Sequence, residues 1–135
     1  MTRENVEILR DAYEALNHRE IESALDVLEP DAEWCEHSDL PEADFYRGRE
    51  AIRAFLLGYL DSWEEFHQET EELIDGGDQV AVLLHLVAKG HGSGIEVEAR
   101  YAHLWTMRDG KGVRVDAYAD RAEALEELHR TRAKR

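Results

Sequence analysis

The stretch "RYAHLWTMRDGKGVRVDAYAD", residues 100–120, predicts two β-strands joined by a Gly-rich turn. We expect one face of this strand pair to carry Tyr101, His103, Trp105, Met107, Asp116 and Tyr118. A buried sheet face is usually filled by aliphatic side chains, so a histidine, an aspartate and two tyrosines there need an explanation. Either these groups satisfy each other in a closed core, or they form the wall of a pocket.

Two further segments share the two-residue alternation of a strand. With the two strands of the opening stretch counted, four segments alternate in this way: "FHQETEELID" (66–75), "QVAVLLHLVAKG" (79–90), "IEVEARYAHLWTMRD" (95–109) and "VRVDAYAD" (113–120). The connections "GGD", "GHGSG" and "GKG" have the length of hairpin turns. The pattern therefore predicts an antiparallel meander of four strands.

Helical periodicity dominates the first half of the chain. Apolar spacing predicts helices over residues 2–17, 21–28, 49–65 and, at the end of the chain, 121–130. Thr2 is a candidate N-cap, and Pro30 ends the second helix near Leu28 or Glu29. Residues 31–37 form a short strand and residues 38–48 a surface loop. Helices followed by strands predict an α+β fold, in which a curved antiparallel sheet wraps around N-terminal helices and a short C-terminal helix closes the chain.

Composition restricts the class of partner. With 135 residues we expect a single domain over 1–135, and the formal net charge of -15 disfavours nucleic acid and anionic membranes. The lone Cys35 allows no intrachain disulfide, and no apolar run suggests a leader or a membrane span. We therefore expect a cytoplasmic protein.

No short motif points to a metal, a nucleotide or a nucleophile. The seven histidines show no helical i, i+4 pair, so we predict no metal ion and no cofactor, with His85 and His91 at the sheet edge or in a loop. "GHGSG" (90–94) opens no helix and is predicted to be a hairpin loop rather than a phosphate-binding loop. The acidic run 63–73 is expected to be a solvated surface.

The remaining candidate chemistry lies in the opening stretch. If His103 and Asp116 meet on adjacent strands, the carboxylate orients the imidazole and raises its basicity, as general acid–base catalysis requires. Trp34, Phe55 and Tyr59 are candidates for aromatic walls of the same cavity. This pairing is an expectation about geometry that the sequence leaves open.

The order of elements and three segments resemble a known family. "AYEALNHREIESALDVLEPDAEW", "YRGREAIRAF" and "VRVDAYADRAEALEEL" are similar to the SnoaL-like branch of the nuclear transport factor two-like superfamily, which also holds ketosteroid isomerase and limonene epoxide hydrolase. The resemblance covers nearly the whole chain and implies a cone-shaped fold around an apolar pocket. The same fold carries isomerases, cyclases, dehydratases, hydrolases and non-catalytic binders.

The resemblance also implies roles for particular residues. Asp116 matches the acid–base aspartate of SnoaL-like cyclases, with His103 as its neighbour and Tyr118 as an auxiliary donor. Glu36 falls near the base carboxylate of ketosteroid isomerase, whose oxyanion tyrosine falls one residue from Tyr13. The substrate-binding residues would be Tyr101, Trp105, Trp34, Phe55, Tyr59 and Tyr13.

Two relatives' catalytic sets are incomplete in this chain. The protonated aspartate of ketosteroid isomerase falls near His103, and the Arg-x-Asp pair of epoxide hydrolases is replaced by Arg100-Tyr101-Ala102. The expected function is cofactor-free proton transfer on a small apolar carbonyl compound, as in a cyclase or an isomerase. The alternative is a non-catalytic module of the same fold that binds a small apolar or aromatic molecule or forms a homodimer, and the resemblance implies a homodimer in either case.

Overall fold

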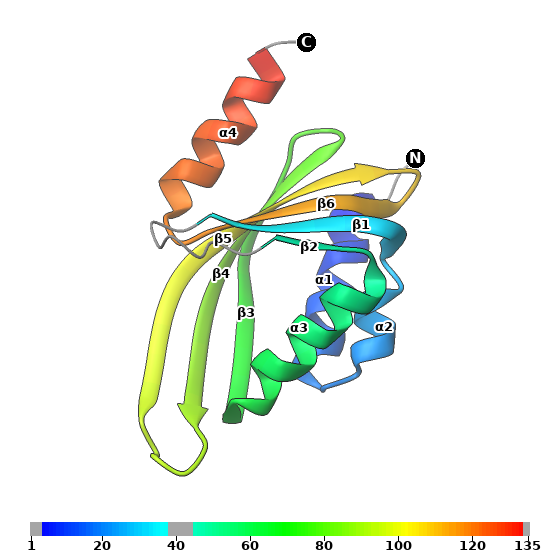
Figure 1. Ribbon diagram of the computed structural model, residues 1–135. Coiled ribbons are helices and arrows are strands. Elements are labelled where there is room, and N and C mark those ends of the chain that lie inside the picture. The colour runs from blue at the N-terminus through cyan, green and yellow to red at the C-terminus, as the bar shows by residue number, and fades with distance from the viewer. Residues whose placement is uncertain (1–3, 38–44, 134–135) are drawn as a thin grey trace.

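The computed structural model describes residues 4–37 and 45–133 (Figure 1). Its elements, in chain order, are α1 (Glu4–Asn17), α2 (Ile21–Leu25), β1 (Leu28–His37), β2 (Phe45–Arg47), α3 (Arg49–Asp61), β3 (Trp63–Asp75), β4 (Gln79–Gly90), β5 (Glu96–Arg108), β6 (Lys111–Tyr118) and α4 (Arg121–Ala133). Within the described ranges, no helix has the length and apolar character needed to cross a bilayer. The predicted α+β fold is confirmed.

The six strands form one curved sheet in the order β2-β1-β6-β5-β4-β3. Strands β3 to β6 make the predicted antiparallel meander, in which each strand pairs with the next along the chain. Strand β1 joins the far side of β6 in parallel, with Trp34 opposite Val115. This parallel pairing was not predicted, because periodicity within a strand does not report which strand lies next to it.

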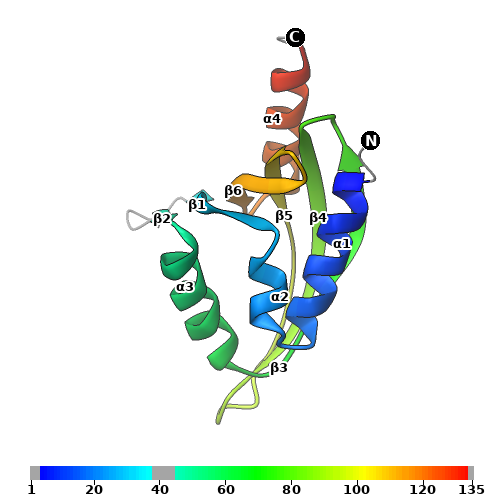
Figure 2. The ribbon, with the colours of Figure 1, turned by 90° about the vertical axis from the view of Figure 1, so that its right-hand side faces the viewer.

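Helices cover both faces of the sheet. Helices α1, α2 and α3 lie on its concave side (Figures 1 and 2), where Leu9 and Ile52 are fully buried in the same hydrophobic cluster as Val82 and Leu84 of β4. On the outer face, Leu128 of α4 packs with Leu104. The concave side holds most of the core, so the cavity described below opens within the main hydrophobic cluster.

Several predicted boundaries were wrong. Helix α2 ends at Leu25, and β1 begins at Leu28. Helix α3 ends at Asp61 rather than near residue 65, because Trp63 already pairs with Gly90 of β4 and strand pairing overrides the helical pattern. Residues 45–47, predicted as loop, form β2. The predicted N-cap Thr2 and residues 38–44 of the predicted loop lie outside the described residues.

Gly112 of β6 is required by close packing. A Cβ atom built on Gly112 would lie 2.6 Å from two ring carbons of Trp105, so only glycine lets the indole lie flat against this strand. Gly58 of α3 has no heavy atom within 4 Å of its Cβ position. The two glycines therefore differ in the space around them.

We predict opposite effects of one substitution at these two positions. Gly112→Ala should lower the free energy of unfolding by about 1–3 kcal/mol through overpacking, whereas Gly58→Ala should raise it by about 0.5–1 kcal/mol because alanine favours helix. Urea unfolding followed by circular dichroism measures both. Equal effects of the two substitutions would contradict the packing of Trp105 on Gly112.

Candidate functional site

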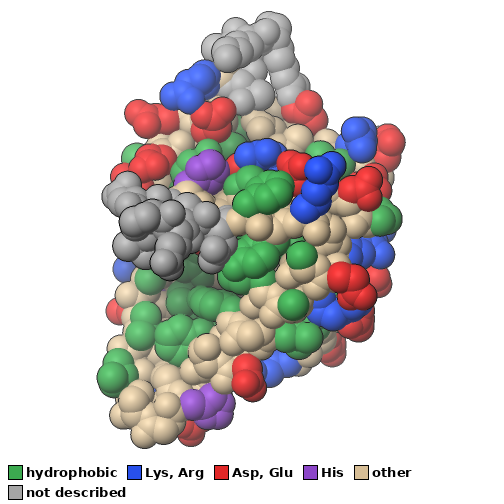
Figure 3. All heavy atoms as spheres, in the orientation of Figure 1, with side chains coloured by type: hydrophobic (Ala, Val, Ile, Leu, Met, Phe, Trp, Pro, Cys, Tyr) green, Lys and Arg blue, Asp and Glu red, His purple; other side chains and the backbone are tan. Residues whose placement is uncertain are grey.

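A cavity of about 590 Å³ lies between the concave face of the sheet and the N-terminal helices. Figure 3 shows hydrophobic side chains gathered around a hollow on the face seen in Figure 1. Its lining is rich in aromatic residues, namely Tyr13, Trp34, Phe55, Tyr59, Trp63, Tyr101, Trp105 and Tyr118. All six predicted substrate-binding residues are in this set. An aromatic wall of this kind suits an apolar ligand larger than a few atoms.

His103 lies in this wall and is hydrogen-bonded to Tyr13, which in turn is hydrogen-bonded to Trp105. The phenol oxygen of Tyr13, on α1, is 2.5 Å from Nδ1 of His103, and Nε1 of Trp105 donates to the same oxygen at 2.8 Å. Burial lowers the pKa of His103 to about 3, so its imidazole is neutral at pH 7. Burial likewise raises the pKa of Tyr13 above its ordinary value. Tyr13, His103 and Trp105 therefore form a hydrogen-bonded network of uncharged side chains.

Glu36 brings a carboxylate to the cavity. It lies on β1 two residues after Trp34, on the same side of the strand, and the Trp34 indole donates to its Oε2 at 2.6 Å. The pKa values of Tyr59 and Tyr101 are raised chiefly by burial, and the negative charge of Glu36 adds to the effect on both. The Glu36 carboxylate thus acts electrostatically on two phenols of the cavity wall.

Gln68 of β3 completes this part of the wall. It is buried, and its Nε2 donates to the phenol oxygen of Tyr101. The backbone of Gln68 is held by Asn17 at the end of α1, through bonds of 2.8 and 2.9 Å. Sequence reasoning missed Gln68 because it lies inside the acidic run 63–73, which was expected to be solvated.

The prediction that Asp116 shares a face with His103 is wrong. In the register of β5 and β6, His103 is opposite Ala117 and Asp116 is opposite Leu104, so the aspartate lies on the outer face. Its carboxylate accepts bonds from Arg114 at 3.0–3.1 Å and from Nε2 of His37 at 2.8 Å. The pairing of β5 with β6 contains a register shift between Thr106 and Met107, which moves Asp116 by one residue from the predicted alternation.

His37 and Tyr118 stack on each other, and both are among the residues that line the cavity. Tyr118 is opposite Ala102, so its ring belongs to the outer face, where it stacks on His37 with 4.5 Å between ring centroids. Both residues nevertheless contribute to the cavity lining. Burial raises the pKa of Tyr118 to about 12. His37 was missed because its partner Asp116 comes from β6, whose pairing with β1 was not foreseen.

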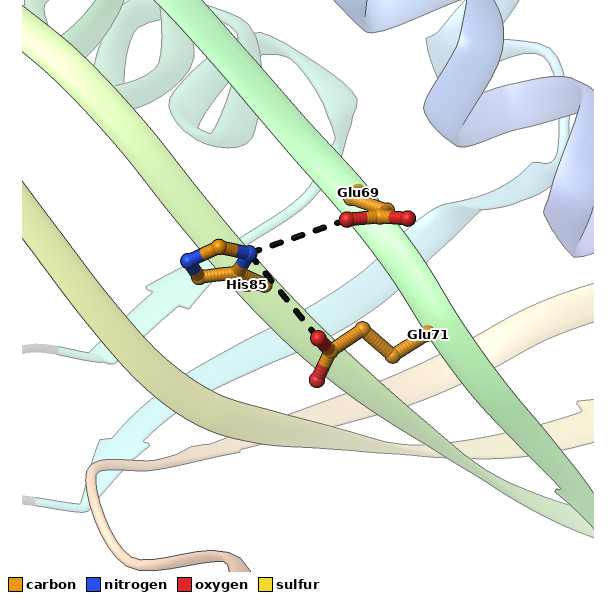
Figure 4. A group of neighbouring side chains, drawn as sticks. All are labelled: Glu69, Glu71 and His85. Atoms are coloured by element: carbon orange, nitrogen blue, oxygen red, sulfur yellow. Dashed lines mark ion pairs between the residues drawn. The ribbon is translucent and has the colours of Figure 1, made fainter.

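Three potential metal ligands, Glu69, Glu71 and His85, lie together on the outer face of the sheet (Figure 4). Nδ1 of His85 is 3.6 Å from Glu69 and 3.8 Å from Glu71. Sequence spacing did not reveal this group, because its members come from two strands. Glu71 also pairs with Arg121 and Arg100, and His85 pairs with Glu98, so ion pairs account for the arrangement. We predict no metal at this position.

The architecture and the sequence are similar to known proteins. The structure of TerC co-crystallized with polyporic acid superimposes with a TM-score of 0.75 at 26% identity, over 93% of this chain and 98% of TerC. A nuclear transport factor two-like protein from Burkholderia pseudomallei gives a TM-score of 0.77 at 22% identity, over 95% of this chain and 98% of that one. No curated protein sequence matches the chain.

A third structure shows the fold with a steroid derivative. A Mycobacterium tuberculosis protein in complex with estradiol-17β-hemisuccinate has a TM-score of 0.67 at 19% identity, over 79% of this chain and 86% of that one. Proteins of this fold thus include binders of small molecules. The family profile described as "SnoaL-like domain" matches residues 9–115, which is more than half of the chain. The chain therefore belongs to the SnoaL-like family, as its sequence resemblance predicted.

Proposed function

We propose that the protein catalyses proton transfer at a carbon next to a carbonyl group, on a small apolar or aromatic substrate bound in the cavity, without a cofactor. The observation that carries this proposal is the placement of one carboxylate, Glu36, and one neutral imidazole, His103, in the same aromatic cavity. Proteins of the fold in complex with polyporic acid and with estradiol-17β-hemisuccinate support a small organic molecule as the ligand.

Glu36 takes the role of the acid–base group in this proposal. The carboxylate removes a proton from the α-carbon, the C–H electron pair moves into the enolate, and Glu36 returns the proton at another position. The Trp34 indole, which donates to Oε2, fixes the orientation of the carboxylate. Asp116, the base expected from the sequence, lies on the outer face and accepts a hydrogen bond from His37 instead.

His103 and Tyr101 stabilise the oxygen on which charge develops. Both side chains line the cavity, and both are largely removed from water. Fixed polar groups in such a site stabilise an enolate more strongly than water does, because they need no reorganisation during the reaction. The aromatic walls exclude water from the enolate and hold the substrate in place.

Glu36→Gln should remove activity while Glu33→Gln, on the outer face of the same strand, should retain it. Loss of a general base lowers the rate by about 10²- to 10⁴-fold. The measurement is hydrogen–deuterium exchange at the α-carbons of cyclic ketones and diketones, followed by NMR. Absence of exchange above buffer in the wild type, or equal rates in the two variants, would refute the proposed reaction.

The cavity should be the place where ligands bind. Ala99 lines it, and Ala99→Phe should fill part of the volume and weaken binding of polyporic acid by about tenfold or more, since about 1.4 kcal/mol of lost contact suffices. Ala122→Phe on the exposed side of α4 is the matched control. Quenching of tryptophan fluorescence reports binding. The same affinity in both variants would place the ligand elsewhere.

Burial of neutral His103 should make stability depend on pH. The pKa is about 3 in the folded protein and about 6.5 in the unfolded chain, so the unfolded state binds an extra proton between these values. The free energy of unfolding should therefore fall as pH decreases from about 7.5, by up to about 1.4 kcal/mol per pH unit from this residue. Urea unfolding at several pH values should show a shallower dependence for His103→Gln. Parallel curves for variant and wild type would contradict a buried neutral imidazole.

A further inference from the structure

The bonds around Tyr13 determine which nitrogen of His103 carries the proton. Trp105 has only an N–H to offer, so the Tyr13 oxygen must accept at 2.8 Å. The phenol also has one proton of its own. Among the described residues, Nδ1 of His103, 2.5 Å away, is the other hydrogen-bond partner of this oxygen.

Two arrangements of protons are conceivable, and they differ in cost. If Tyr13 donates to an unprotonated Nδ1, every proton between Trp105 and Nδ1 has an acceptor. The remaining ring proton, on Nε2, is then the donor that His103 offers in the cavity, and Nε2 is not among the fully buried atoms without a partner. If Nδ1 is protonated and donates to Tyr13, the phenol proton is left without an acceptor, although the Tyr13 side chain is only 5% exposed. Buried donors without acceptors are strongly disfavoured, so the first arrangement prevails.

We propose that Tyr13 and Trp105 are positioning residues that hold His103 in the Nε2–H tautomer, so that the cavity presents a neutral N–H donor to an acceptor oxygen of the ligand. A single proton on the ring follows from its burial, and its place on Nε2 follows from the Tyr13 contact. The tautomer itself is independent of the proposed function, whereas the identity of the ligand oxygen as a reacting carbonyl rests on that function.

This tautomer selects among ligands. A ketone, a quinone or a phenolate has an oxygen that accepts from Nε2–H, whereas a hydrocarbon of the same shape leaves this buried donor unsatisfied. The preference for a ligand oxygen over a hydrocarbon then comes from the cost of an unpaired Nε2–H rather than from the shape of the cavity. The hydrogen-bond chain also starts at an indole that cannot reverse its direction, so the donor character of Nε2 does not depend on the ligand.

The direct test is NMR of the protein with ¹⁵N-labelled histidine. The wild type should show His103 with a protonated Nε2 and an unprotonated Nδ1. In Tyr13→Phe the constraint is gone, and the two resonances should move toward each other as the tautomers mix. Trp105→Phe should shift them in the same direction. Tyr46→Phe, which removes a phenol that stacks on Phe55 away from this network, should leave both unchanged.

A protonated Nδ1 in the wild type would overturn the proposal, even if both variants failed to fold. Unchanged resonances in a folded Tyr13→Phe would do the same.

Wild type should bind 2-acetylnaphthalene about 3- to 10-fold more tightly than 2-isopropylnaphthalene, as expected for one net hydrogen bond, and Tyr13→Phe should lose most of this preference. Equal affinities in the wild type would contradict selection by the donor. If this preference is found but no α-proton exchange occurs, the proposed reaction fails and the tautomer assignment stands.

Discussion

The hydrogen bonds that join Tyr13 of α1 to His103 and Trp105 of β5 connect the helical layer to the concave face of the sheet. Each of the three rings is almost fully buried, and the hydrogen bonds among them offset part of the cost of burying their polar atoms. The network therefore fixes how α1 approaches the sheet. The cavity lies beside this network, and aromatic rings make up much of its wall.

The two-residue alternation of β-strands separates this cavity from a second polar region. Glu36 and Trp34 of β1 face inward, while Glu33 and Cys35 face the same side as Asp116. On the outer face, Arg114 bridges Glu33 and Asp116 in an ion-pair network. The register shift between Thr106 and Met107 places Asp116 on the outer face, and without it Asp116 would lie opposite His103 on the concave face.

Most of the fold was predictable because its elements carry strong periodic patterns. The meander from β3 to β6 and the helices α1 and α3 were found from apolar spacing, and the family resemblance supplied their arrangement. The end of α3 was misplaced because Trp63 fits the helical stripe equally well and only its pairing with Gly90 decides its conformation.

The site was predictable in composition but not in pairing. Tyr101, His103 and Trp105 share the cavity face because of the alternation of one strand, β5, which the local sequence encodes. The partner of Asp116 depends on the register shift within the β5–β6 pairing and on the parallel addition of β1, and neither leaves a pattern in the sequence. For the same reason the bonds of His37 to Asp116, and of Gln68 to Tyr101, became visible only in three dimensions.

A crystal structure of the protein with 2-acetylnaphthalene tests the central claim most directly. The account predicts that the ligand occupies the cavity, with its ketone oxygen about 2.7–3.2 Å from Nε2 of His103 and its methyl carbon facing the Glu36 carboxylate. A ligand bound on the outer face beside Asp116, or one in the cavity with its oxygen directed away from His103, would contradict it.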